Sequence, residues 1–202
     1  MNNVKGWNAF ASTYDRYIER AKEGDIIVEV GVLFGKSILH LCDGLRKRGL
    51  LGKVEVWAID PWQLTEHMLP VGWPWRADVE KSGGPFNCYC DSVLGADREL
   101  AEAIRVVRAR GVQGARLFND ASLTMVMIDS EHTYMGCSQE IHTWWPKIKT
   151  GGMLAGDDYG DPTNGYTEKS PFYGVVKAVR DFFPGGVKVD RHTWEVVRKR
   201  FM

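Results

Sequence analysis

The stretch from residue 26 to residue 37, IIVEVGVLFGKS, decides the fold of this chain. It opens with a short run of apolar residues, which is typical of a buried strand. Gly31 and Gly35 follow, and glycine permits both a sharp turn and a close approach of the backbone to a ligand. The turn leads into a segment with helical spacing, whose first N–H groups can receive polar or anionic atoms. A strand, a glycine turn and a helix in this order indicate a nucleotide or cofactor site.

An acid at the tip of the next predicted strand strengthens this interpretation. The strand is expected over residues 54–59, and Asp60 follows it directly. In dinucleotide-binding folds a carboxylate in this place accepts hydrogen bonds from the hydroxyls of a ribose. An ordinary tight turn has no need of such an acid. The combination therefore favours a bound cofactor over a purely structural turn.

The rest of the chain alternates short apolar runs with amphipathic helical patterns. Further strands are expected at 104–107, 124–128 and 153–155, with a closing antiparallel pair at 187–189 and 194–197. Helical spacing is found at 38–45, 141–148 and 175–182. Strands that alternate with helices imply a mostly parallel sheet covered on both faces. The pattern predicts a single α/β domain over residues 1–202.

One segment interrupts the alternation. Residues 61–87 hold four prolines and three tryptophans. Such a segment is too long for an ordinary connection, and loops of this kind often cover a binding site. We expect a lid or insertion here, although a packed surface excursion is the alternative.

The composition narrows the class of protein. The 202 residues carry a formal net charge of +0, so nothing indicates binding to nucleic acid or to an anionic membrane. The N-terminal residues lack the apolar core of a signal peptide, and no apolar run is long enough to span a bilayer. We expect a cytoplasmic protein whose four cysteines are reduced thiols, since their spacing does not match a zinc site.

A nucleotide hydrolase is the main competing interpretation of the glycine turn. The P-loop of such enzymes places four residues between its first glycine and the Gly-Lys-Ser/Thr. Here Gly31 and Gly35 enclose only three residues, so the phosphate cradle is one residue short. The dinucleotide pattern G-x-G-x-x-G also fails, because Leu33 and Lys36 occupy its second and third glycine positions.

The chain resembles the class I S-adenosylmethionine-dependent methyltransferases. Within them it is similar to the family of the macrocin, mycinamicin and novobiocin O-methyltransferases. The segments that carry the resemblance are VEVGVLFGKS, VWAIDPW, MVMIDSEHTY, WWPKIKTGGMLAGDDY and GVVKAVRDFF. The resemblance implies a Rossmann-like three-layer sandwich, with a seven-stranded, mostly parallel sheet and one antiparallel strand near the C-terminus.

The resemblance also implies a set of residues for the cofactor, S-adenosyl-L-methionine. Glu29, Gly31 and Gly35 would face its methionine part, Asp60 its ribose, and Pro61 and Trp62 the edge of its adenine. The complete expected set is Glu29, Gly31, Val32, Gly35, Ser37, Asp60, Pro61, Trp62 and Asp129. Ala109-Arg110-Gly111 stands where the family often has a serine near the adenine.

Three aspartates follow two adjacent predicted strands. Asp129 follows the strand at 124–128, and Asp157 and Asp158 follow the strand that begins at Met153. At one edge of a parallel sheet, each close pair of carboxylates would repel by ~4 kcal/mol at an effective dielectric of 20. A hard cation relieves that repulsion, and oxygen ligands favour Mg²⁺, Mn²⁺ or Ca²⁺ over Zn²⁺. We predict a metal site at these three residues, although capping of turns is the alternative.

His132 is the candidate catalytic base. It lies three residues beyond Asp129, and a neutral imidazole suits proton transfer near pH 7. Some sugar methyltransferases of the resembled family carry a histidine here. The expected reaction is methyl transfer to a hydroxyl of a small molecule, a sugar, phenol or secondary metabolite, with metal assistance. A cofactor-binding protein without turnover is a further alternative, and a homodimer is the candidate assembly.

Overall fold

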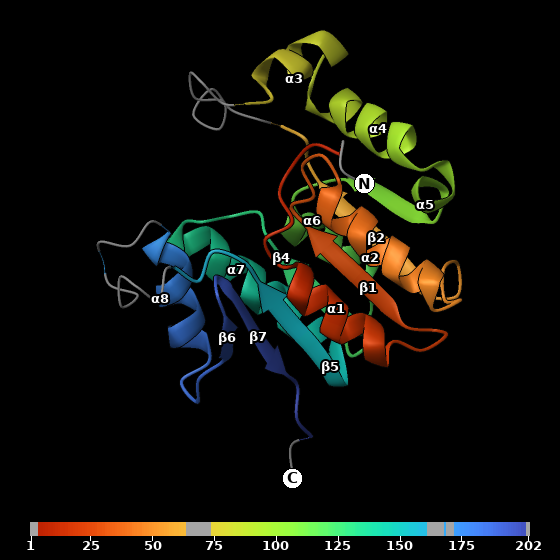
Figure 1. The fold of residues 1–202 in the computed structure, drawn as a ribbon. Coiled ribbons are helices and arrows are strands. Elements are labelled where there is room, and N and C mark those ends of the chain that lie inside the picture. Colours follow the sequence, from red (N-terminus) through yellow and green to blue (C-terminus); the bar gives the residue numbers. More distant parts are fainter. Residues whose placement is uncertain (1–3, 64–73, 161–167, 169–171, 201–202) are drawn as a thin grey trace.

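A seven-stranded sheet forms the centre of the protein (Figure 1). The computed structural model describes residues 4–63, 74–160, 168 and 172–200. Its strands are β1 (Ile26–Val30), β2 (Glu55–Asp60), β3 (Ile104–Arg108), β4 (Leu123–Ile128), β5 (Ile148–Gly156), β6 (Lys188–Asp190) and β7 (Thr193–Val197). The helices around it are α1 (Ala11–Arg20), α2 (Lys36–Lys47), α3 (Arg76–Ser82), α4 (Pro85–Ala96), α5 (Arg98–Glu102), α6 (Gly111–Gly114), α7 (Tyr134–Trp144) and α8 (Tyr173–Phe182), with 3₁₀ turns η2 (Ala115–Leu117) and η3 (Trp145–Lys147).

The order of the strands is β3-β2-β1-β4-β5-β7-β6. Neighbours are parallel from β3 to β5, and β7 runs antiparallel to both β5 and β6. The predicted fold class, including the single antiparallel strand near the C-terminus, is confirmed. The strands expected at 26–30, 54–59 and 124–128 are found within one residue at each end.

Alternate residues of each strand enter different cores, because side chains of a strand point to opposite faces of the sheet. Ile27 belongs to the core beneath α1 and α2, whereas Val28 belongs to the core beneath α7 and α8. Met125 and Val126 divide in the same way. The three-layer arrangement follows, since each face of the sheet is buried by its own set of helices (Figure 1).

Helices α3, α4 and α5 form an insertion between β2 and β3, drawn in yellow and green in Figure 1. The insertion explains why the alternation of strands and helices is interrupted there. Residues 64–73 of the predicted lid lie outside the described residues. The role of the segment 61–87 as a lid stays a prediction.

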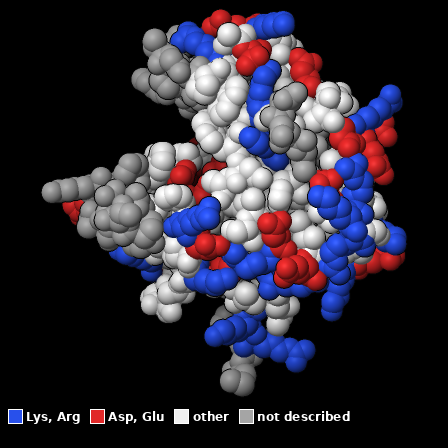
Figure 2. All heavy atoms as spheres, viewed as in Figure 1, with Lys and Arg blue, Asp and Glu red and all other residues white. Residues whose placement is uncertain are grey.

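Figure 2 shows basic and acidic side chains interspersed over the visible face, in line with the formal net charge of +0. Among the described residues, no helix is both long and apolar enough to cross a membrane.

Candidate functional site

The candidate site lies along the edge of the sheet where the central parallel strands end. Val30 of β1 pairs with Ile59 of β2 and with Ile128 of β4. Ile128 in turn pairs with Gly156 of β5, so the four strands end at a common level. The predicted residues that end these strands or follow them within two positions are Gly31, Asp60, Asp129, Asp157 and Asp158. The structure places this set along one edge, as expected.

Gly31 brings the glycine turn into direct contact with the end of β4. Its φ of 85° is in the left-handed region that favours glycine, and a Cβ there would overlap the carbonyl oxygen of Asp129. The backbone N–H of Asp129 donates to the carbonyl of Val30 at 2.7 Å. The glycine therefore allows the turn and the first acid of the site to lie side by side.

Asp60 holds the glycine turn in shape. Its carboxylate accepts hydrogen bonds from the backbone N–H groups of Val32 at 2.9 Å and Leu33 at 3.0 Å, and from that of Trp62 at 2.5 Å. Burial raises the pKa of this carboxyl, and the three backbone donors act in the opposite direction. A carboxylate has about four acceptor positions, so a ribose hydroxyl can still bind. The sequence shows only that Asp60 lies at the end of a predicted strand, so it did not indicate that this residue also holds the turn.

Trp62 lies beneath the insertion and is only 3% exposed. Its indole N–H donates to the carbonyl of Leu33 at 2.7 Å, and its ring centroid lies 4.7 Å from that of Tyr89 and 5.0 Å from that of Phe86. A Cβ on Gly35 would overlap the side chain of Val93, which lies on the same helix α4 as Tyr89. The predicted contacts of Trp62, and of its neighbour Pro61, with an adenine therefore stay predictions.

Glu29 is buried beneath the turn and is bound by two hydroxyls. It accepts hydrogen bonds from Ser37 at 2.5 Å and from Tyr14 at 2.6 Å. Burial raises the pKa of Glu29 to about 7, although both hydroxyls lower it, and the charge of Asp60 adds to the increase. Two predicted cofactor residues, Glu29 and Ser37, thus contact each other. Tyr14 comes from α1, and no spacing in the sequence could have indicated it.

Asp129, His132 and Asp158 gather at the other side of the turn. Each offers one ligand atom, and these atoms lie within 4.8 Å of one another. Burial raises the pKa of Asp129 well above its usual range, and the charges of Asp157 and Asp158 raise it further. Crowded carboxylates with one imidazole suit a divalent cation, because the cation removes the repulsion between them.

Asp157 lies beside this group but outside the set of three. Its carboxylate accepts a hydrogen bond from the hydroxyl of Thr193 at 3.3 Å. Burial raises the pKa of Asp157 to about 6, and the charge of Asp158 contributes to the increase. The predicted metal set of Asp129, Asp157 and Asp158 thus differs from the observed group, in which His132 takes the third place.

His132 contacts Asp158 directly, with 2.9 Å between Nε2 and Oδ2. Its side chain is 41% exposed, and its ring centroid lies 4.6 Å from that of Phe172. Burial lowers the pKa of this imidazole, but the hydrogen bond and charge of Asp158 and the charge of Asp157 raise it above its ordinary value. The ring is both oriented by an acid and open to solvent.

Ser130 and Glu140 lie behind the candidate site and form hydrogen bonds with each other. Glu140 on α7 is 2% exposed, and the hydroxyl of Ser130 lies 2.7 Å from each of its carboxylate oxygens. Burial raises the pKa of Glu140 to about 7, although the hydrogen bond from Ser130 lowers it. The sequence shows an acid on a helical face here, but not that the face is buried.

The chain matches the sequence model of a family described as a methyltransferase domain over residues 28–159. This match covers more than half of the chain and includes the glycine turn and the acids at the edge of the sheet. The chain therefore belongs to this methyltransferase family. No curated protein sequence matches it.

Solved structures share the fold at low sequence identity. A cofactor-bound protein from MTB is 15% identical with a TM-score of 0.61, over 98% of this chain and 84% of that chain. For a putative caffeoyl-CoA O-methyltransferase from Staphylococcus aureus the values are 15% and 0.60, over 98% and 87%. For the O-methyltransferase NovP they are 18% and 0.54, over 94% and 79%. Family and fold together support an S-adenosylmethionine-dependent methyltransferase.

Proposed function

We propose that this protein transfers a methyl group from S-adenosylmethionine to a hydroxyl of a small molecule, with the assistance of a divalent metal ion. The observation that carries the proposal is the shared edge of the sheet. The glycine turn and Asp60 lie there beside a group of two carboxylates and one imidazole. The candidate cofactor site and the candidate cation site are thus adjacent, which is what a metal-assisted transfer requires.

The cofactor would lie against the turn between β1 and α2. Gly31 and Val32 form this turn, and Asp60 can bind the ribose hydroxyls with its remaining acceptor capacity. The acids near the turn also suit a ligand with a positive charge. S-adenosylmethionine, when bound, supplies a methyl group on a cationic sulfur that is activated for in-line displacement.

The metal would be held by the acids at the ends of β4 and β5. Asp129 and Asp158 offer oxygen ligands within one group, and Asp157 lies next to them. The fit rests on the crowding of Asp129, His132 and Asp158, whose ligand atoms lie within 4.8 Å of one another, because carboxylates held close together gain most from a cation. A bound metal would lower the pKa of an acceptor hydroxyl and orient it toward the methyl group.

His132 is proposed to accept the proton of the acceptor hydroxyl. Its ring is partly exposed, so an acceptor that enters from solvent can reach it. Asp158, at 2.9 Å, would stabilise the imidazolium that forms. This assignment uses His132 as a base rather than as a third metal ligand.

The class of acceptor rests on similarity. Solved structures with this fold include proteins named O-methyltransferases, and the resemblance in the sequence is to a family that includes sugar methyltransferases. Sugars, phenols and other small hydroxyl compounds are therefore the first acceptors to test. The partner is proposed to be a small molecule rather than nucleic acid or membrane, and a homodimer is the candidate assembly.

The test is formation of S-adenosylhomocysteine from S-adenosylmethionine across a panel of such acceptors. We expect turnover that is lost in EDTA and restored by Mg²⁺. The double variant Asp157→Ala/Asp158→Ala should lose turnover but still bind S-adenosylhomocysteine in calorimetry. The control is Glu99→Ala/Glu102→Ala, which removes two exposed acids from α5 and should leave turnover unchanged.

Two other results would contradict the proposed function. Full turnover in the Asp157→Ala/Asp158→Ala variant would refute the metal role. A protein that binds S-adenosylhomocysteine but consumes no S-adenosylmethionine with any acceptor would be a cofactor-binding protein without turnover.

A further inference from the structure

We infer that the turn at residues 190–194, between β6 and β7, shapes the acidic side of the site, and that Thr193 is a positioning residue for Asp157. We call residues 190–194 the C-terminal turn and residues 156–160 the rim loop. The rim loop carries Asp157 and Asp158, so this inference rests on the proposed function of that site. The C-terminal turn lies more than thirty residues further along the chain.

Close packing joins the two segments at the end of β5. Gly156 pairs with Trp194, and a Cβ on Gly156 would lie within 2.6 Å of the indole nitrogen. Trp194 is 1% exposed, so it cannot move aside into solvent. The preceding residue, Thr193, is 3% exposed, and its hydroxyl donates a hydrogen bond to Asp157 at 3.3 Å.

Hydrogen bonds of His192 join the C-terminal turn to the residues that follow the two acids. The N–H of Tyr159 donates to the carbonyl of His192 at 2.8 Å, and Nδ1 of His192 lies 2.9 Å from the carbonyl of Gly160. Asp158 lies between Asp157, which Thr193 contacts, and Tyr159, and its φ of 58° is a left-handed conformation that costs a non-glycine residue free energy. Contacts on both sides of Asp158 hold the rim loop in this conformation.

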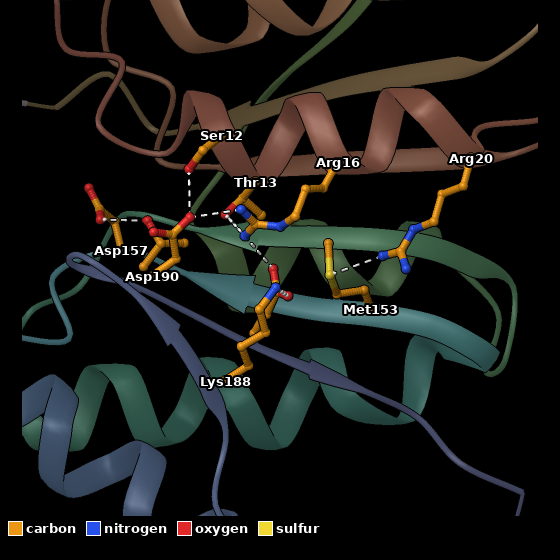
Figure 3. Close-up of polar contacts among 10 residues, drawn as sticks. Ser12, Thr13, Arg16, Arg20, Met153, Asp157, Lys188 and Asp190 are labelled. Carbon is orange, nitrogen blue, oxygen red and sulfur yellow. Dashed lines mark hydrogen bonds and ion pairs between the residues drawn. The ribbon is translucent and has the colours of Figure 1, made fainter.

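Helix α1 anchors the C-terminal turn in its place, as Figure 3 shows. Arg16 donates to Asp190 at 2.7 Å and to Glu195 at 2.8 Å, and Ser12 donates to the same carboxylate of Asp190 at 2.9 Å. Lys188 lies 2.7 Å from the other oxygen of Glu195. Both strands of the β6–β7 hairpin are thereby tied to the helix that also carries Tyr14 to the glycine turn.

Some residues of the site would therefore bind the ligand directly, whereas others hold the acids in position. Asp157 is one of the acids at the ends of β4 and β5 that are proposed to hold the metal, and Thr193 is its hydrogen-bond partner. Changes in such outer hydrogen-bond partners of metal ligands commonly reduce metal affinity by about 10–100-fold. Thr193→Val keeps the branched shape of the side chain and removes only the hydroxyl. Thr193→Ser keeps the hydroxyl and serves as the matched control.

The experiment measures Mn²⁺ affinity by calorimetry and amide hydrogen exchange of the rim loop in both variants. We expect Thr193→Val to bind Mn²⁺ at least tenfold more weakly and to exchange faster at residues 157–160, with unchanged exchange in β1 and β4. Thr193→Ser should match the unaltered protein in both measurements. Affinity for S-adenosylhomocysteine should not change in either variant.

The possible results distinguish a failure of this inference from a failure of the proposed function. If the unaltered protein and Thr193→Val bind Mn²⁺ equally, the positioning role is wrong while the metal site stands. If the unaltered protein binds no Mn²⁺, the metal role is wrong and the positioning role toward a metal falls with it. Equal losses in Thr193→Val and Thr193→Ser would also refute the role of the hydroxyl.

A second variant tests the anchor on α1. Arg16→Gln removes the ion pairs with Asp190 and Glu195, and we expect it to increase exchange of the rim loop and weaken Mn²⁺ binding in the same direction as Thr193→Val. Arg98→Gln removes an exposed i,i+4 pair on α5 and should change neither measurement. Unchanged exchange of the rim loop in Arg16→Gln would refute the anchoring role of α1.

Discussion

Buried carboxyls lie directly behind the residues that line the candidate site. Glu29 and Glu140 are 1% and 2% exposed, and each is bound by hydroxyl groups rather than by a basic side chain. Such an environment favours the protonated acid, since burial penalises the charge. At the scale of single residues, these acids couple the stability of the site to pH.

Glu140 gives a testable pH dependence. Its pKa is raised from 4.5 to about 7 in the fold, so its contribution to stability is fully present below pH 4.5 and is lost as pH rises through about 7. This difference corresponds to at most about 3 kcal/mol. Glu140→Gln cannot ionise, so we expect its free energy of unfolding relative to that of the unaltered protein to increase between pH 5 and pH 8. Urea denaturation at both pH values measures this difference.

The control for this prediction is an exposed acid on another helix. Glu102→Gln, on α5, should give the same difference from the unaltered protein at pH 5 and pH 8. A Glu140→Gln variant whose relative stability falls as pH rises would contradict the prediction.

At the scale of elements, the turn between β1 and α2 is defined by what lies against it. Asp60 and the start of α2 contact it from within the first βαβ unit, and the end of β4 meets it from a distant part of the sequence. The expectation of a glycine turn was therefore correct, but the sequence did not show which backbone it would meet. The close approach to Asp129 explains why the position of this turn and that of the first acid depend on each other.

Two glycines with the same backbone conformation allow a matched test. Gly31 has a φ of 85° and Gly24 a φ of 83°, yet a Cβ on Gly24 would contact nothing within 4 Å. Both Gly→Ala changes cost the strain of a left-handed residue, on the order of 1–3 kcal/mol. Only Gly31→Ala also displaces the backbone of Asp129.

We expect Gly31→Ala to be less stable than Gly24→Ala and to lose binding of S-adenosylhomocysteine, which Gly24→Ala should retain. Thermal unfolding gives the difference in stability, and calorimetry gives the binding. Equal affinity of the two variants for S-adenosylhomocysteine would show that the close approach of the turn to β4 does not shape the cofactor site.

At the scale of the whole molecule, both ends of the chain contribute to one edge of the sheet. Tyr14 of α1 reaches Glu29, and Thr193 of β7 reaches Asp157. A ligand that binds at this edge therefore stabilises contacts between distant segments. Because a ligand that binds only the folded state adds to the free energy of unfolding, binding should stabilise the domain as a whole.

The cofactor interpretation predicts which ligand has this effect. We expect S-adenosylhomocysteine, at a concentration 100-fold above its dissociation constant, to increase the free energy of unfolding by about 2.7 kcal/mol. ATP with Mg²⁺ should leave it unchanged, because the glycine turn is one residue short of a phosphate cradle. Thermal unfolding with each ligand measures both effects, and stabilisation by ATP alone would contradict the proposed function.

The alternation of the central strands and helices, the glycine turn and the acids at the strand ends could all be predicted from the sequence. These features are local: apolar periodicity, glycine and the residue after a strand can be recognised within a few positions. The tertiary structure alone decided that Tyr14, Glu140 and Thr193 support the site, and that His132 rather than Asp157 completes the group of three. These contacts join residues on different elements, and their existence depends on how the layers pack, which no local pattern encodes.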